Sequence, residues 1–121
     1  IRTKGRKASA RIFDRLVSQM TGHGTDEEPM MNIVAWRDEG LYNVVVFPRR
    51  SHRPACYDAE GEAQMLISPG AIDMGGIIIT PREEDFCRID AGTAMAILRE
   101  CAASEDDVAA IVSRLKESMW A

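Results

Sequence analysis

Residues 31–48, MNIVAWRDEGLYNVVVFP, carry the clearest structural pattern in this chain. It holds two runs rich in β-branched and aromatic residues, Met31–Arg37 and Leu41–Phe47, separated by Asp38-Glu39-Gly40. The glycine supplies the left-handed backbone conformation that a short hairpin loop needs. The second run is nearly apolar on both faces, which predicts a strand inside the sheet, and Pro48 is expected to end that strand. The stretch therefore predicts a β-hairpin.

Apolar residues recur at helical spacing in three other segments of the chain. The expected helices run from Ala8 to Met20, from Ala91 to Cys101 behind the N-cap Asp90, and from Glu105 to Met119 behind Ser104. Asp107 stands at the capping-box position of the last helix. These segments predict one helix before the hairpin and two helices at the end of the chain.

The middle of the chain carries weaker signals. Residues 49–61 have no regular pattern, and residues 62–67 fit either a short strand or a helical turn. Ser68-Pro69-Gly70 predicts a turn, and Ile72–Thr80 predicts a further strand in which Gly75-Gly76 marks a bulge or a close backbone approach. Strands in the middle with helices at both ends predict an α+β fold, an antiparallel sheet covered by helices on one side, in a single domain over residues 1–121.

Composition narrows the class of protein. The chain has 121 residues, 45% of them hydrophobic and 28% charged, which is ordinary for a globular domain. Its apolar runs are far too short to span a bilayer, and no apolar core follows the basic start of the chain, so we expect a cytoplasmic protein without a membrane or a secretion signal. Because the chain opens without methionine, with charge and a helix, we expect it to be the C-terminal part of a longer protein.

The cysteine spacing argues against disulfides and a zinc site, and the charge pattern argues against nucleic acid as a partner. Cys56, Cys87 and Cys101 are an odd number at wide spacing, which predicts buried, reduced thiols and neither a disulfide framework nor a zinc site. The first fifteen residues carry six basic groups and one acid. This end can contact a phosphate backbone, but a solvated helix with a basic start is the favoured interpretation. Nucleic acid is therefore not expected as a partner.

The strongest local signal for chemistry is Pro48-Arg49-Arg50-Ser51-His52-Arg53-Pro54. Three arginines and a histidine follow the end of a predicted central strand, and guanidinium groups match phosphate oxygens in geometry and charge. Arg49, Arg50, His52 and Arg53 are therefore the candidate phosphate- or nucleotide-binding residues. The competing interpretation, favoured on the residues alone, is a solvated turn whose arginines pair with acids further along the chain, namely Asp58, Glu60 and Glu62.

Other polar residues are assigned structural or solvent-facing roles. His23 lies between two glycines in a predicted exposed turn, and no second histidine stands at a metal-binding spacing. The run Arg82-Glu83-Glu84-Asp85 predicts a solvated helix start, and we expect no metal site there. The sequence has no glycine-rich phosphate loop, no serine nucleophile elbow and no His-x-His. We therefore expect no catalytic residue and no cofactor in this chain, which alone is expected to be inactive.

From Asn32 onward the order of features resembles the C-terminal part of the GDP-hexose phosphorylases of the histidine-triad superfamily, including a bacterial branch of that family. The pieces that carry the resemblance are Val46-Phe47-Pro48-Arg49, then residues 54–60 (PACYDAE), residues 68–76 (SPGAIDMGG) and residues 81–86 (PREEDF). The resemblance implies a partial histidine-triad-like fold. It also implies covalent nucleotidyl transfer, in which a histidine of a His-x-His motif attacks the α-phosphate.

Because no such motif is present, the resemblance implies that the nucleophile belongs to an upstream half of the same protein. The expected function is thus the C-terminal part of a nucleotidyltransferase or nucleotide-sugar phosphorylase, with a nucleotide or nucleotide sugar as ligand. This part would contribute fold and phosphate contacts. The alternative is a non-catalytic binding or oligomerisation domain, such as a homodimer, that uses a strand edge or apolar helix faces.

Overall fold

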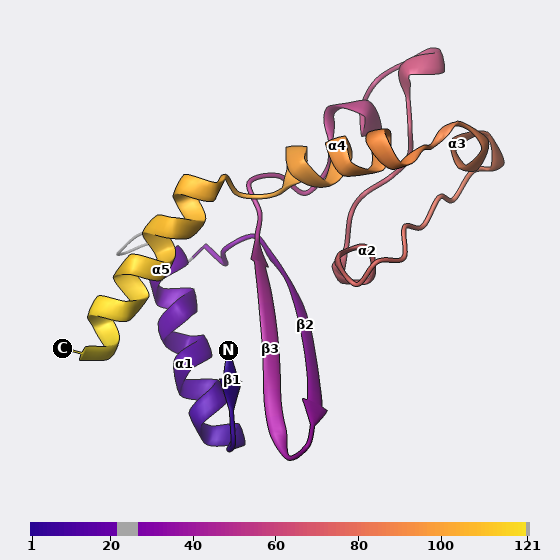
Figure 1. Ribbon diagram of the computed structural model, residues 1–121. Helices are drawn as coiled ribbons and strands as arrows, with labels where there is room; N and C mark the ends of the chain where they lie inside the picture. The colour runs from indigo at the N-terminus through magenta and orange to yellow at the C-terminus, as the bar shows by residue number, and fades with distance from the viewer. Residues whose placement is uncertain (22–26, 121) are drawn as a thin grey trace.

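The computed structural model describes residues 1–21 and 27–120, and these residues form an α+β fold (Figure 1). A three-stranded antiparallel sheet is accompanied by helices before and after it in the chain. The elements, in order, are β1 (Arg2–Thr3), α1 (Arg6–Met20), β2 (Met31–Asp38), β3 (Leu41–Pro48), two 3₁₀ turns η1 (Ala55–Tyr57) and η2 (Gly61–Ala63), α2 (Ala71–Met74), α3 (Glu83–Arg88), α4 (Ala91–Cys101) and α5 (Glu105–Trp120).

The predicted hairpin is confirmed, with a loop one residue shorter than expected. Asp38 pairs with Leu41, so Glu39 and Gly40 alone make the turn. Both have positive φ, 46° for Glu39 and 79° for Gly40, as a type I′ turn requires. This turn matches the twist of the strands, and the ladder continues to the pair Met31–Pro48.

The strand order is β1-β3-β2, which confirms that the apolar strand β3 is central. Strand β1 was not predicted, because two residues carry no periodic signal. It pairs Arg2 with Asn43 and Thr3 with Tyr42. The backbone of Ile1 extends this pairing, since its ammonium donates to the Val44 carbonyl and its own carbonyl accepts from the Val44 N–H.

The prediction of a strand over Ile72–Thr80 is wrong. Residues Ala71–Met74 form the one-turn helix α2, and the following residues up to Thr80 are irregular. The Asp73 carboxylate accepts hydrogen bonds from the backbone N–H groups of Gly70 and Ile79, which closes the segment into a loop. Gly76, at φ 101°, makes a left-handed turn and not a strand bulge. Local carboxylate–backbone bonds therefore overcome the β propensity of the isoleucines.

The predicted helices are confirmed with small shifts at their ends. The Asp90 carboxylate accepts from the Thr93 N–H at the start of α4, which has the predicted bounds. At α5, the Ser104 hydroxyl accepts from the Asp107 N–H, and the Asp107 carboxylate accepts from the Ser104 N–H. The predicted turn at residues 68–70 is not observed, and Gly70 is extended where it leads into α2.

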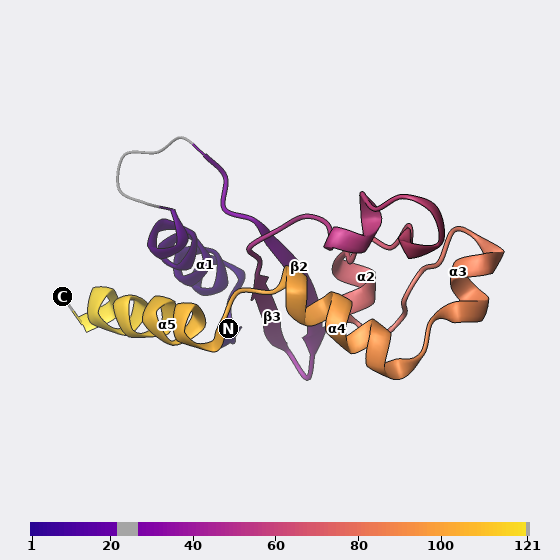
Figure 2. The same ribbon diagram turned by 90° about the horizontal axis from the view of Figure 1, so that it is seen from above.

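The helices cover less of the sheet than the sequence suggests. Helix α1 contacts β1 and β3, and α2 contacts β2. Helices α1 and α5 lie side by side at one end of the molecule, whereas α4 leads away from the sheet toward α3 (Figures 1 and 2). Buried Leu16 and Ile111 lie on α1 and α5, and a second buried cluster of Met65, Ile67 and Ile97 lies at the α4 end.

The cysteine prediction holds in part. All three thiols are free, but only Cys101 is buried, since Cys56 is half-buried and Cys87 is exposed on α3. Burial, followed by the nearby Glu100 carboxylate, raises the pKa of the Cys56 thiol. Within the described ranges, no helix is both long and apolar enough to cross a membrane.

Candidate functional site

Residues 48–54, called the cationic turn below, begin where the end of β3 pairs with the linker between α4 and α5, residues 102–104. Arg49 forms an isolated bridge with Ala102, the Arg50 N–H donates to the Cys101 carbonyl, and the Ala103 N–H donates to the Pro48 carbonyl. The end of the central strand is thereby joined to a segment more than fifty residues further along the chain. This pairing fixes the backbone from which the candidate arginines extend.

Arg49 ties together three segments of the chain. Its Nη1 donates to the Pro69 carbonyl and, at 3.2 Å, to the Asn32 Oδ1 atom on β2. Its Nη2 donates to the His52 carbonyl at 2.7 Å. The guanidinium is therefore held by β2, the turn itself and the loop before α2.

The other three residues of the turn do not converge with Arg49 on one point. Arg50 is exposed, and its Nε donates to the Glu100 carbonyl at 2.9 Å. The Arg53 guanidinium lies over the Tyr57 ring, 4.2 Å from its centre. His52 is exposed, and its carbonyl also accepts from the Ser68 hydroxyl. The exposure of Arg50, His52 and Arg53 agrees with the solvated turn of the competing interpretation. The expected pairing with acids is not observed, because the ion pairs among the described residues all involve Arg82 or Arg88.

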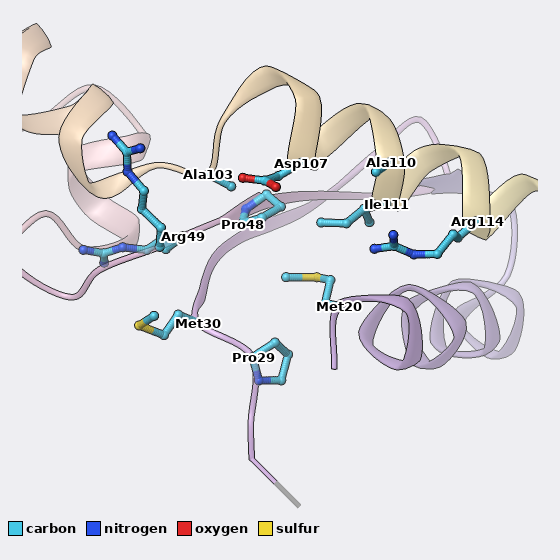
Figure 3. A pocket seen from close by; sticks show the side chains of 11 residues that line it. Met20, Pro29, Met30, Pro48, Arg49, Ala103, Asp107, Ala110, Ile111 and Arg114 are labelled. Carbon is cyan, nitrogen blue, oxygen red and sulfur yellow. The ribbon is translucent and has the colours of Figure 1, made fainter. Parts of the chain in front are cut away.

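A cavity of about 300 Å³ lies beside the start of the turn (Figure 3). Its lining comes from the end of α1, the two residues before β2, the end of β3 and the turn after it, the linker before α5 and one face of α5. The residues that line it are Met20, Pro29, Met30, Pro48, Arg49, Arg50, Ala103, Asp107, Ala110, Ile111 and Arg114. Arg49 and Arg50 therefore border a concavity, whereas His52 and Arg53 are outside its lining.

Arg114 and Asp107 are cavity residues that sequence reasoning missed. Both lie on the face of α5 that also carries Ile111, as their spacing of seven residues on a helix requires. Arg114 Nη2 donates to the Gln19 carbonyl of α1 at 3.1 Å, which ties the two helices together. The Ser104 hydroxyl is the main cause of a lowered pKa at Asp107, and Arg50 adds to it. The cavity thus has two cationic side chains and one carboxylate besides Arg49.

The acid run at the start of α3 is buried only at its last residue, Asp85, whereas Glu83 and Glu84 are exposed. The prediction of a solvated helix start is therefore corrected at Asp85 alone. Asp85 has no exposed surface and accepts from Arg82 Nε at 2.8 Å, Arg88 Nη2 at 2.7 Å and the Leu66 N–H at 3.0 Å. The hydrogen bonds from Arg82, aided by those from Arg88, hold the pKa of Asp85 far below its usual range.

A cavity of about 560 Å³ lies beside this cluster and is lined by both arginines, with Gly61, Glu62, Gln64 and Glu84. The arginines are engaged there by other protein groups. Arg82 donates to the Gln64 side chain and carbonyl, and Arg88 donates to the Glu62 and Gln64 carbonyls. The cluster therefore joins α3 to residues 62–66 and is structural.

His23, the other histidine, lies outside the described residues. In the part of the chain that the structure describes, no group of three or more histidine, cysteine or acidic side chains is arranged to hold a metal. Searches against family models, curated proteins and solved structures found no match to this chain.

Proposed function

We propose that this chain is the C-terminal part of a cytoplasmic nucleotidyltransferase or nucleotide-sugar phosphorylase of the histidine-triad type. In this proposal the upstream half of the same protein supplies the nucleophilic histidine. The described chain contributes fold and positive charge near the phosphates of a nucleotide or nucleotide sugar. The resemblance of residues 46–86 to the GDP-hexose phosphorylases provides the reaction class.

The observation that carries the proposal is the cavity at the end of the central strand. Arg49 and Arg50 border this cavity from the turn that follows β3, and Arg114 borders it from α5. Guanidinium groups form charge-assisted hydrogen bonds with phosphate oxygens, and Arg50 and Arg114 are exposed and therefore accessible to a ligand. Arg50 and Arg114 each donate one hydrogen bond to a backbone carbonyl, so both keep further N–H groups for a ligand.

The internal contacts of each arginine determine which substitutions can test for ligand binding. Removing Arg49 would break contacts with three segments, so weaker binding would not distinguish a ligand contact from a folding defect. Arg50→Ala and Arg114→Ala remove cavity charge with fewer internal contacts. Arg99→Ala is the matched control, because Arg99 is exposed on α4 outside the cavity lining.

The test is calorimetric titration of GDP-, UDP- and ADP-linked sugars into the full-length protein. A hydrogen bond to a charged group is worth about 1.5–3 kcal/mol, so each cavity variant should weaken binding by about 10-fold or more. Arg99→Ala should bind as the unchanged protein does. Equal binding by all variants would show that the cavity is not the ligand site. A full-length sequence with no His-x-His motif upstream would contradict the proposed nucleotidyl transfer.

A second candidate function, a non-catalytic binding or oligomerisation domain, is favoured by exposed apolar side chains. Ile77, Phe86 and Trp120 are 67%, 70% and 87% exposed. Exposed apolar groups indicate a surface that binds another protein segment where they are contiguous. Such a set lies on α5, where Val108, Val112 and Met119 follow at helical spacing and are 36%, 40% and 44% exposed. Light scattering on this chain distinguishes the two functions, because a stable dimer without nucleotide affinity supports the second and contradicts the first.

A further inference from the structure

Strand β2 is an edge of the sheet, because the strand order is β1-β3-β2. The hydrogen bonds of Val44 on β3 show which backbone groups of β2 face outward. Val44 lies opposite Ala35, and both its N–H and its carbonyl bond to Ile1. The pair Ala35–Val44 is therefore a non-hydrogen-bonded pair, so the N–H and carbonyl of Ala35 point away from β3. The same alternation turns the N–H and carbonyl of Arg37 outward.

The second half of this edge is open. All residues from Ala35 to Asp38 are exposed. Within residues 1–21 and 27–120, no group forms a hydrogen bond with the outward N–H or carbonyl of Ala35 or Arg37. The pairing with β3 has no bulge here, and this half of the strand has no proline or lysine. Bulges, prolines and lysines are the features that commonly keep edge strands from pairing, so this half keeps a free hydrogen-bonding edge.

Helix α2 flanks the first half of β2 (Figure 1). The Arg49 guanidinium contacts both Asn32 on β2 and Pro69 just before α2, which places this helix near the start of the strand. The room for an added strand is therefore beside the second half of β2.

We propose that β2 pairs antiparallel with β2 of a second copy of this chain, about a two-fold axis at Trp36. Ala35 and Arg37 stand symmetrically on either side of Trp36, so this axis pairs Ala35 of each copy with Arg37 of the other. Each of these pairs exchanges two hydrogen bonds, and every outward backbone group of this half of the strand gains a partner. The free segment is thus complementary to itself, which identifies a second copy as the occupant. The proposal specifies the surface of the second candidate function and does not depend on nucleotide binding.

Other axes on the same edge fit less well. An axis at Arg37 places two like charges directly opposite each other. An axis at Ala35 brings Arg37 of the second copy beside Ile33, in the half of the strand that α2 flanks. The axis at Trp36 avoids both, and it places the two Trp36 side chains, each 49% exposed, in a non-hydrogen-bonded pair, where opposite side chains are closest.

Sedimentation velocity over a series of concentrations tests this proposal. The shared edge is smaller than a standard interface of about 1,200–2,000 Å², so we expect a dimer that dissociates on dilution. Ala35→Pro removes an outward N–H that takes no part in the pairing with β3. Proline is tolerated at such edge positions, so this variant should stay folded and should be monomeric.

Two charge substitutions at Ala35 test the register without requiring that proline fit the strand. Ala35→Glu places a carboxylate opposite Arg37 of the second copy at two symmetric positions, so it should strengthen the dimer by roughly 2- to 30-fold. Ala35→Lys places like charges there and should weaken it by a similar factor. Ala96→Glu and Ala96→Lys are the matched controls, because Ala96 is exposed on α4, and neither should change the dissociation constant. Effects of the same sign from the two Ala35 variants would overturn the proposed pairing.

Tryptophan emission gives a direct readout on the folded chain. The chain has two tryptophans, Trp36 and Trp120, so a Trp120→Phe variant reports on Trp36 alone. Its emission should move to longer wavelength on dilution, as the indole ring returns to water.

The remaining outcomes separate this inference from the function on which it builds. A dimer that persists in Ala35→Pro, with unshifted Trp36 emission, would overturn the β2 pairing and leave the apolar face of α5 as the interface. A chain that stays monomeric up to about 1 mM would overturn both the pairing and the homodimer of the second candidate function.

Discussion

At the scale of single residues, Asp85 belongs to a run of acids that the sequence predicts to be solvated, but its carboxylate is buried among hydrogen-bond donors. It is fully buried, and its carboxylate is held by Arg82, Arg88 and the Leu66 N–H. The arginines are close to it in sequence, but Leu66 is distant. The sequence shows three adjacent acids, and nothing in their spacing tells which one turns inward.

Asp85→Asn should lower the stability of the chain and change its dependence on pH. The folded-state pKa of Asp85 is lowered, so its stabilising effect is complete above the unfolded value of about 3.9 and is lost as pH falls below that value. Urea titrations at a series of pH values should show a lower midpoint for the variant at pH 7 and a smaller decline below pH 4. Glu84→Gln is the control, because Glu84 contacts the same Arg82 from an exposed position. Parallel acid profiles for Asp85→Asn and the unchanged chain would contradict this account.

The three thiols should react in an order set by their exposure. Cys87 is exposed, Cys56 is half-buried with a raised pKa, and Cys101 is buried. Because the thiolate is the reactive form, Cys87 should be alkylated first and Cys56 more slowly, whereas Cys101 should react only after unfolding. Mass spectrometry of peptides after timed iodoacetamide treatment measures this order. Rapid labelling of Cys101 in the folded chain would show that the α4 end opens readily.

At the scale of elements, the turn of the hairpin predicts opposite effects on stability for substitutions at two adjacent residues. Gly40 has φ 79°, so Gly40→Ala should destabilise the chain by about 1–2 kcal/mol. Glu39 has φ 46°, a conformation that asparagine adopts more readily, so Glu39→Asn should stabilise it by a few tenths of a kcal/mol. Urea unfolding of both variants measures the difference. The same sign for both changes would contradict the type I′ turn.

The α5 helix offers a test of its N-terminal cap. The Ser104 hydroxyl accepts from the Asp107 N–H, so Ser104→Ala should cost about 1 kcal/mol in the free energy of unfolding. Ser113→Ala is the matched control, since Ser113 is exposed within the same helix. The control should change the unfolding free energy by less than about 0.5 kcal/mol. Equal effects of the two changes would show that the cap does not stabilise α5.

At the scale of the whole molecule, the buried apolar residues form two groups toward opposite ends of the molecule, with the sheet between them (Figure 2). Leu16 and Ile111 lie where α1 meets α5, and Ile67 is the centre of the cluster near α4. The strand end and the linker at Arg49 and Ala102 connect the two ends. The ends are therefore expected to differ in their response to a core substitution.

Ile67→Ala should destabilise the α4 end by about 2–5 kcal/mol, because it removes a fully buried side chain. Hydrogen exchange should accelerate at the amides of α4 more than at those of β2 and β3. Ile77→Ala, at an exposed isoleucine, is the control and should have little effect. Equal acceleration over the whole chain would show that both ends unfold as one unit.

The hairpin, its central strand and the three longer helices follow from local sequence, because turn glycines, helix caps and apolar periodicity act between residues close in the chain. Contacts between distant segments make Ile72–Thr80 a loop, bring β1 into the sheet and bury Asp85. For the candidate site, the sequence identified Arg49 and Arg50, but it gave no sign of Arg114 or Asn32 beside them. These outcomes depend on segments that meet across long sequence separations, where partners and burial are set by packing and have no local signature.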